Sequence, residues 1–316
     1  RAINGHSYVA EATKAKIFAA MRELNYHPNN IAQQLRGQGT KMIGVVISFI
    51  TNPFFAYLVD AVDRALSAEG YRAVMLQTLE DPAKEAQYVA MLQSKQLDGL
   101  IMADLENDSD EVAELVQAGK IVLCNRYLGT RPLPIIQIDE EQAAYAATAY
   151  LLDRGYQRLA FCTGGERNPQ DLRFKGFEKA LADHGRTFNE AWYFSEVLTE
   201  GDGAALIKRL AANRPAGADG DTALPDAIFS NGDQVAAGML QGARTAGWRV
   251  PDQLAIMGFD DQPVAALTNP TLTTVRQPIK AIGTAAAQTV LAHIRGEAVP
   301  PIPALTTTVV PRETTR

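Results

Sequence analysis

From Met42 onward, short runs rich in β-branched and apolar residues alternate with longer stretches that have helical spacing. The short runs are MIGVVIS, RAVMLQT, DGLIMA, KIVLCN, PIIQID, RLAFCTG, DAIFSN, LAIMGFD and TLTTV. Stretches such as FFAYLVDAVDRALSAEG and AKEAQYVAMLQSKQ lie between them. Apolar strands that alternate with amphipathic helices indicate parallel sheets covered by helices on both faces. Four helical stretches are each followed by a glycine, at Gly70, Gly155, Gly185 and Gly247. A glycine just past a helix favours the left-handed conformation that ends it.

The predicted fold class is therefore α/β with doubly wound parallel sheets. The strand runs are too numerous for one sheet of the mononucleotide-binding type, and the series divides near Thr163, Gly164 and Gly165. We expect two doubly wound lobes. Such sheets bind ligands beyond the carboxyl ends of their strands, so the expected binding site is a cleft between the lobes.

The chain of 316 residues is 47% hydrophobic and 21% charged, which is ordinary for a globular protein. Its net charge of −6 is unevenly distributed. Residues 1–41 carry six Lys or Arg and two Glu, a balance of +4, which leaves −10 for the remainder. A basic head on an acidic body is typical of a protein whose head binds an anion. Chance clustering on a solvated face is the alternative.

Several classes of protein are disfavoured by the sequence. No window approaches about eighteen consecutive apolar residues and no secretory signal pattern opens the chain, so we expect a cytoplasmic protein without a membrane span.

The cysteines and histidines show no pattern of a metal site. Cys124 and Cys162 lie in apolar runs, which favours buried thiols. The histidines are scattered and no CxxC pair occurs, so we expect no metal site and no cofactor. GxSxG, HExxH and P-loop patterns are absent, and we expect no enzymatic activity.

The first forty residues differ in texture from the body. The segment NGHSYVAEATKAKIFAAMRELNY places apolar side chains on one helical face, which suits a helix of a small helical domain. One helix cannot bury a core, so we expect this segment to be part of a larger helical domain. The following segment NNIAQQLRG, residues 29–37, has a narrow apolar edge and is too short to remain helical in water by itself.

The residues of this region resemble one family. The run RAINGHSYVAEATKAKIFAAMRELNYHPNNIAQQLRGQGTKMIGVVISFITNPFF is similar to the LacI/GalR family of bacterial transcription regulators. It resembles the end of their helix-turn-helix, the third headpiece helix, the hinge helix and the first strand of the effector domain. The similarity continues through DLRFKGFEKAL, FSNGDQVAAGML, VPDQLAIMGFDD and NPTLTTVRQP, so ordered motifs cover nearly the whole chain.

This resemblance implies a domain organisation. It comprises a partial DNA-binding headpiece (1–27), a hinge helix or linker (28–41), and an effector-binding and dimerisation domain of periplasmic-binding-protein type I (42–316). Within that domain we expect a first lobe over about 42–162 and 278–304, and a second lobe over about 163–277 and 305–316. Family members normally carry a further segment ahead of the part that matches RAINGHS, with most of the recognition helix. We therefore expect a chain cut inside its helix-turn-helix that reads DNA sequence poorly.

The resemblance assigns several residues to DNA binding. In the family, two hinge helices meet in the minor groove of the operator, and a leucine from each wedges into the central base step. Leu35 matches that leucine. The free-energy cost of unstacking the base step is offset by the added contacts that the bent DNA makes with the protein. The assigned residues are Asn4, Tyr8, Thr13, Asn29, Ala32, Leu35 and Arg36. An interdomain linker is the alternative for the hinge, and capping or surface roles are the alternative for Asn4, Tyr8 and Thr13.

The resemblance also implies an effector site. The matching residues are Phe54, Phe55, Asn125, Arg126, Arg173, Asn231 and Asp260. Arg173 matches a guanidinium that holds two hydroxyls or a carboxylate, and Asp260 matches a carboxylate that accepts bonds from ligand hydroxyls. Asn125 stands where many sugar-responsive relatives have Asp, which leaves the ligand preference open. One ring, of Phe54 or Phe55 but not both, is expected to face a sugar, and the alternative is an apolar residue at the start of the next helix.

Two further assignments concern the segment SNGDQVAAG and a pair of glycines. In SNGDQVAAG, either Asn231 or Gly232 takes the position on the effector side, and Asp233 is expected to cap the following helix. The pair Gly164 and Gly165 is expected at the crossover between lobes rather than at a phosphate site.

Together these features predict a DNA-binding transcription regulator of the repressor type for carbohydrate-utilisation genes. A sugar or sugar derivative bound between the lobes would control it allosterically. The expected partners are operator DNA, the effector and a second copy of the chain in a homodimer or a higher oligomer. The alternative is a sugar-binding protein of the periplasmic type without DNA binding. The basic head and the missing export signal count against that alternative.

Overall fold

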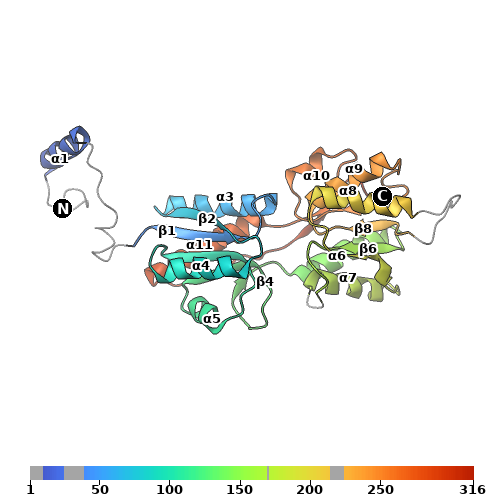
Figure 1. Ribbon diagram of the computed structural model, residues 1–316, viewed down its shortest axis with the longest axis horizontal. Helices are drawn as coiled ribbons and strands as arrows, with labels where there is room; N and C mark the ends of the chain where they lie inside the picture. Colours follow the sequence, from blue (N-terminus) through green and yellow to red (C-terminus); the bar gives the residue numbers. More distant parts are fainter. Residues whose placement is uncertain (1–9, 25–38, 169–170, 214–223) are drawn as a thin grey trace.

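The computed structural model describes residues 10–24, 39–168, 171–213 and 224–316. Two α/β lobes lie side by side along the long axis (Figure 1). Helix α1 (Glu11–Glu23) stands apart from both lobes, and none of its residues is buried. The headpiece domain that this helix was expected to join is therefore not formed within the described residues. The DNA-binding assignments Asn4, Tyr8, Asn29, Ala32, Leu35 and Arg36 lie outside the described residues.

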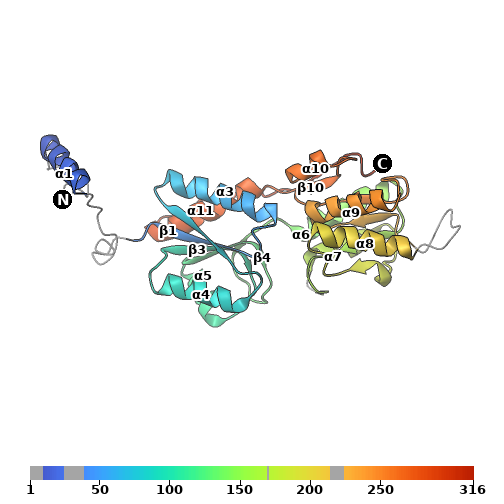
Figure 2. The same ribbon diagram turned by 45° about the horizontal axis from the view of Figure 1, so that its top comes forward.

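The first lobe contains a five-stranded parallel sheet in the order β2-β1-β3-β4-β5. Its strands are β1 (Met42–Ile47), β2 (Arg72–Gln77), β3 (Gly99–Leu105), β4 (Ile121–Tyr127) and β5 (Ile135–Ile136). Helices α3 (Pro53–Ala68) and α11 (Ile279–Arg295) cover one face, and α4 (Pro82–Gln93) and α5 (Asp110–Gln117) cover the other (Figure 2). Alternate residues of β1 divide between the two faces: Ile43 and Val45 pack toward α3, and Val46 packs toward α4.

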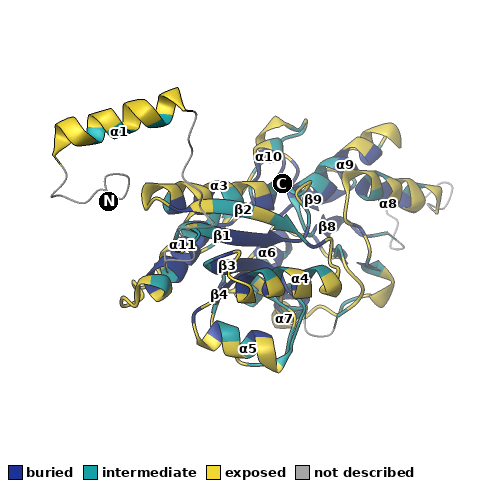
Figure 3. Cartoon of the chain, turned by 60° about the vertical axis from the view of Figure 1, so that its left-hand side comes forward, coloured by how far each residue is buried: buried dark blue, intermediate teal, exposed yellow. Residues whose placement is uncertain are grey.

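The second lobe repeats this plan with a four-stranded parallel sheet in the order β7-β6-β8-β9. Its strands are β6 (Leu159–Cys162), β7 (Tyr193–Phe194), β8 (Ala227–Phe229) and β9 (Ala255–Met257). Helices α6 (Glu140–Asp153) and α7 (Leu172–Asp183) pack on one face through Phe161, while α8 (Glu200–Ala212) and α9 (Asp233–Thr245) pack on the other. In Figure 3 the buried strands lie between helices whose exposed faces point outward.

Short elements complete the second lobe. They are the 3-10 helix η1 (Glu190–Trp192), helix α10 (Pro263–Leu267) and a two-stranded antiparallel sheet of β10 (Thr274–Arg276) and β11 (Thr308–Val310). Isolated bridges join Met257 to Thr273 and Asp260 to Arg276, so β10 extends the sheet edge beyond β9. The sequence predicted all of the strands except β7 and β11. Neither stands out in the sequence: β11 continues a run of threonines and has no fully buried residue, and β7 is followed directly by Ser195 and Glu196.

The expected boundary between the lobes near residue 162 is wrong. Strand β6 pairs with β7 and β8, and α6 packs on α7, so the chain enters the second lobe between β5 and α6. Gly164 and Gly165 follow β6 inside the second lobe and are not at the crossover. Helix α11 packs on α3 in the first lobe. The glycines mark turns rather than lobe boundaries, which explains the error.

Local sequence explains the helix ends. Asn52 caps α3 by accepting from the Phe54 N–H, and Pro53 occupies the first turn, where no N–H is needed. A capping box of Thr199 and Asp202 opens α8. The four glycines predicted to end helices all have positive φ, between 65° and 87°.

Other sequence-based expectations concern single side chains. Cys124 and Cys162 are free and buried, as predicted, and burial raises the pKa of the Cys162 thiol to about 12. Among the described residues, no helix combines the length and apolar character needed to cross a bilayer. Within the same part of the chain, no group of three or more His, Cys, Asp or Glu side chains is placed to hold a metal ion.

Close helix packing predicts different effects for two glycines. A methyl group at Gly238 in α9 would overlap the backbone carbonyl of Glu200 at the start of α8. Gly238→Ala should therefore lower the free energy of unfolding by about 1–3 kcal/mol or more, because backbone cannot yield as a flexible side chain does. Urea unfolding followed by circular dichroism measures the change.

Gly201→Ala is the matched control on the facing helix. Its added methyl group meets only the Thr199 hydroxyl oxygen, at 3.5 Å, so it should be nearly neutral or slightly stabilising. Equal effects of the two substitutions would show that the α8 and α9 backbones are not in close contact.

Candidate functional site

The strand orders locate the points where ligands bind in sheets of this kind. In the first sheet, β1 lies between β2 and β3; in the second, β6 lies between β7 and β8. The strands that follow β1 and β6 in the chain lie on both sides of them, so the connections run to opposite sides of each of these two strands. This reversal opens a crevice at the carboxyl ends of the sheet. Ser48 follows β1 directly, and Asp104 is near the end of β3, so both lie at the first switch point.

A buried carboxylate organises the first switch point. Asp104 Oδ2 accepts a hydrogen bond from the Ser48 hydroxyl at 2.6 Å, and Oδ1 accepts from the Asn125 amide at 2.8 Å. Arg126 donates to both oxygens, from Nε at 3.4 Å and Nη2 at 3.3 Å. The charge of Asp104 raises the pKa of Arg126, which stays protonated. Three side chains from β1 and β4 thus converge on one carboxylate.

The backbone of β3 and β4 aims these side chains at one another. Asp104 is the register partner of Arg126, and the register shifts just before Asp104. Asn125 adopts a left-handed φ of 65°. A β-bulge of this kind redirects side chains at a sheet edge. Arg126 also contacts Glu80, which follows β2 with a φ of 57°, at 3.4 Å.

A half-buried ion pair organises the second switch point. Arg173, in the first turn of α7, donates from Nε to Glu140 Oε2 and from Nη2 to Glu140 Oε1, the latter at 3.2 Å. Its Nη1 donates to the Asn231 carbonyl at 3.1 Å, and its guanidinium lies 3.7 Å from the centre of the Phe259 ring. Burial opposes the charge, but Glu140 outweighs this effect and raises the pKa of Arg173.

Asp260 lies beside this ion pair at the carboxyl edge. Its Oδ1 accepts from the Gln277 amide at 2.7 Å, and its Oδ2 accepts from the Gln262 amide at 2.9 Å. The residue has a φ of 106°, in the left-handed region. Burial raises the pKa of Asp260 to about 6, although Arg173 and both glutamines act in the opposite direction.

The Gln262 amide also reaches the other lobe, where it donates to Asn52 Oδ1 at 3.4 Å. Asn52 follows β1 and Gln262 follows β9, so the carboxyl edges of the two sheets approach each other here.

The structure corrects the capping role expected of Asp233. Helix α9 has Gly232 at its N-cap and no side-chain capping bond there. The buried Asp233 carboxyl instead accepts from the Gln262 N–H and from the Thr274 hydroxyl, both at 2.6 Å. Burial and the nearby charge of Asp260 raise the pKa of Asp233 to about 8. This group ties α9 to the segment that carries Asp260.

The remaining predicted residues are placed differently. Phe54 and Phe55 both lie in the first turn of α3, buried in the core, with ring centres 5.3 Å apart in an edge contact. They therefore begin a helix, as one alternative predicted, and contact of either ring with a sugar stays a prediction. Asn231 contributes its carbonyl oxygen to Arg173. Thr13 is exposed on α1, and its contact with DNA stays a prediction.

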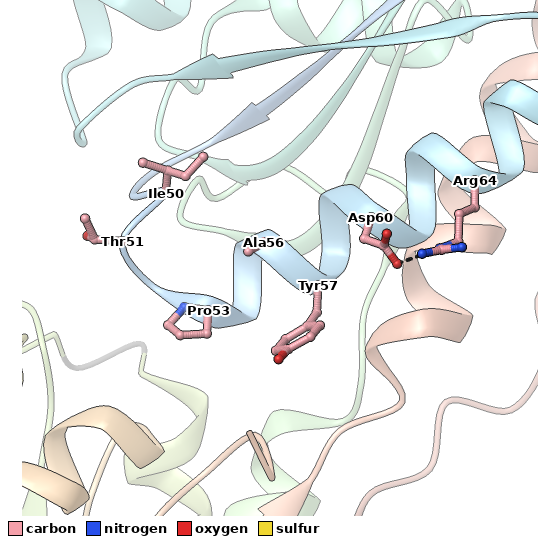
Figure 4. A pocket seen from close by; sticks show the side chains of 7 residues that line it. All are labelled: Ile50, Thr51, Pro53, Ala56, Tyr57, Asp60 and Arg64. Carbon is pink, nitrogen blue, oxygen red and sulfur yellow. Dashed lines mark hydrogen bonds and ion pairs between the residues drawn. The ribbon is translucent and has the colours of Figure 1, made fainter. Parts of the chain in front are cut away.

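A separate groove of about 500 Å³ lies along α3. It is lined by Ile50, Thr51, Pro53, Ala56, Tyr57, Asp60 and Arg64 (Figure 4). Asp60 and Arg64 form an exposed ion pair at one end, at 2.8 Å. None of the seven predicted effector residues lines this groove, so it is distinct from the two polar clusters.

The sequence did not single out several members of these clusters. They are Ser48, Glu80, Asp104, Glu140, Gln262 and Gln277. Asp104 had a usable signal, since an acid directly follows the apolar run LIMA of a predicted strand. Glu140 begins α6 and Gln277 follows β10, where polar residues are common, so nothing distinguishes them until the fold brings them to Arg173 and Asp260.

Comparisons with known proteins agree with this geometry. Residues 148–315 match a periplasmic binding protein-like domain, and residues 1–29 match bacterial regulatory proteins of the lacI family. The NTD biosynthesis operon regulator NtdR of Bacillus subtilis (strain 168) is 32% identical over 94% of this chain and 88% of its own length. The sucrose operon repressor of Pediococcus pentosaceus is 35% identical over 90% and 84%. A LacI family transcriptional regulator from Lactobacillus casei, crystallised with bound sucrose, is 32% identical, with a TM-score of 0.78 over 87% of this chain and 99% of that chain.

The raised pKa of Asp233 predicts a pH dependence of stability. The folded state keeps this proton up to about pH 8, whereas the unfolded group, with an ordinary pKa of 3.8, releases it. The contribution to stability is full below the unfolded pKa and is lost as pH rises through the folded pKa, at no more than about 1.4 kcal/mol per pH unit. Asp233→Asn should remove this loss, so the free energy of unfolding should decline less between pH 5 and 8. Urea titrations at each pH measure it.

Asp108→Asn is the control for that experiment. The Thr130 N–H and the Tyr127 hydroxyl lower the pKa of Asp108 to about 2, so it is ionised in both states between pH 5 and 8. Its removal should leave the pH dependence in this range unchanged. An Asp233→Asn curve parallel to that of the unsubstituted chain would contradict a raised pKa at Asp233.

Proposed function

The chain belongs to the lacI family of bacterial regulatory proteins, and from this premise we propose that it represses carbohydrate-utilisation genes under the control of a sugar or sugar derivative. The observation that carries the proposal is the pair of polar clusters at the facing carboxyl edges. Arg173, Asn231 and Asp260 lie on one edge, and Asn125, Arg126 and Asp104 lie on the other. These groups offer the donors and acceptors that recognise hydroxyls.

In this mechanism the effector bridges the two clusters. Binding replaces internal hydrogen bonds, such as Asn125 to Asp104, with bonds to ligand, and so favours one arrangement of the lobes. The hinge at 28–41 joins the first lobe to the headpiece at 1–27. A change in lobe arrangement in a homodimer alters how two hinges meet the DNA. The coupling is allosteric because effector and operator bind at separate sites.

The proposed DNA contacts follow the family assignment. Leu35 enters a base step in the minor groove, with Ala32 beside it and Arg36 at the phosphates. Asn4, Tyr8, Thr13 and Asn29 supply backbone or groove-edge contacts. For these roles the proposed compartment is the cytoplasm, and the proposed partners are operator DNA and a second copy of the chain. A periplasmic sugar-binding protein is the alternative, but the match of residues 1–29 to the lacI family model favours the regulator.

The wedge role of Leu35 predicts a loss of operator affinity on substitution. In a protein that carries a complete helix-turn-helix ahead of Arg1, Leu35→Ala should weaken binding to a DNA site selected from a random pool by about tenfold or more. Gln34→Ala, one position away in the same segment, is the control and should retain binding within a few fold. Fluorescence anisotropy measures both affinities. Equal affinities of the two variants would refute the wedge.

A further inference from the structure

We infer that the effector carries a protonated amine, so that the ligand class is an amino sugar rather than a neutral sugar or a sugar phosphate. The inference rests on the proposed function and concerns the same two clusters. Two independent features support it: the balance of charges at the two edges, and buried acceptors that lack donors.

Carboxylates outnumber guanidiniums at the first edge. Asp104 and Glu80 both contact Arg126. Glu106 adds a third carboxylate, and burial together with the charges of Glu80 and Glu85 raises its pKa, while Arg126 is the opposing cation. The donors of Arg126, Asn125 and Ser48 are directed at Asp104. An anionic ligand would meet excess negative charge at this edge.

Carboxylates also outnumber guanidiniums at the second edge. Glu140 and Asp260 share one cation, Arg173. The guanidinium donates to Glu140 from two nitrogens and to the Asn231 carbonyl from the third. Three of its five N–H groups are therefore used within the protein. A ligand cation would balance the remaining carboxylate charge, because opposite charges attract strongly where water is excluded.

Two buried carbonyl oxygens lie beside Asp260 without donors. The Oε1 atoms of Gln262 and Gln277 have no hydrogen-bond partner within the described part of the chain, and the two residues are only 3% and 6% exposed. Both side chains direct their NH₂ groups to Asp260, which fixes the orientation of the amides. Buried acceptors without donors are unfavourable and rare in folded proteins.

The buried groups left unpaired beside Asp260, among the described residues, are thus acceptors. An ammonium group has three donors and no acceptor, which matches Asp260 and the two glutamine carbonyls. A hydroxyl brings an acceptor of its own that would need a donor. A phosphate brings several acceptors and negative charge. Of these three groups, the ammonium brings the most donors to the two carbonyl oxygens, and it also supplies the positive charge that Glu140 and Asp260 leave unbalanced.

Matched ligands test the inference by thermal shift and calorimetry on the unsubstituted chain. The probes are glucose, its 2-, 3- and 6-amino derivatives, the corresponding N-acetyl compounds and glucose 6-phosphate. At least one amine should raise the melting temperature, whereas its N-acetyl counterpart, which has the same attachment but no charge, should bind about tenfold or more weakly. Affinity should fall as pH rises through the pKa of the ligand amine.

Two substitutions locate the cation. Asp260→Asn keeps the shape of the side chain and should weaken the amine about tenfold or more, with a smaller effect on any neutral sugar. Glu80→Gln, at the more exposed first edge, provides a second test if Asp260→Asn unfolds. Asp60→Asn removes one carboxylate from the exposed pair with Arg64 and is the control, with unchanged affinity expected.

The outcomes separate this inference from the proposed function. Tighter binding of glucose or glucose 6-phosphate than of every amine would overturn the amine and leave a sugar-controlled regulator intact. Amines that do no better than their N-acetyl counterparts, including a screen in which nothing binds, contradict the inference as well. Failure of the regulator itself would appear elsewhere, as the absence of a selected DNA site for the protein with a complete headpiece.

Discussion

The chain passes between its two sheets three times, and these passages determine where the polar residues of the site lie. The first passage joins β5 to α6, the second joins β10 to α11, and the third joins α11 to β11. Each sheet is parallel, so all of its carboxyl ends lie at one edge. The contact of Asn52 with Gln262 brings those two edges together. Side chains that are distant in sequence thereby enter one region without any long insertion.

Two carboxylates then organise the edges in different ways. Asp104 collects donors from neighbouring strands, while Asp260 is held by two glutamines beside the Arg173 and Glu140 pair. Removing one member of the half-buried Arg173–Glu140 pair leaves the other charge partly out of water and without its partner, which is destabilising. The residues that would bind effector therefore also stabilise the edge when no effector is bound. A ligand has to exchange with these internal bonds, and that exchange links binding to the arrangement of the lobes.

The sequence predicted the repeating architecture because its physical signal is local. Apolar runs and helix-ending glycines identified most strands and the ends of four helices, and family motifs led to Arg126, Arg173 and Asp260. The lobe boundary could not be obtained in this way. The pairing of β6 with β8 is a contact between distant segments, whereas Gly164 and Gly165 only indicate a turn. Asp233 was misassigned for the same reason. Its position at a helix start suggested a cap, but its two carboxyl oxygens instead accept hydrogen bonds from Gln262 and Thr274, which are distant in sequence.

The central claim is that both carboxyl edges bind one effector molecule. The most direct measurement is isothermal titration of an effector that raises the melting temperature, with the unsubstituted chain, Asp104→Asn and Asp260→Asn. We expect one ligand per chain and weaker binding to each variant, because each edge supplies part of the same site. Two ligands per chain, or an affinity that only one of the substitutions changes, would contradict a shared site.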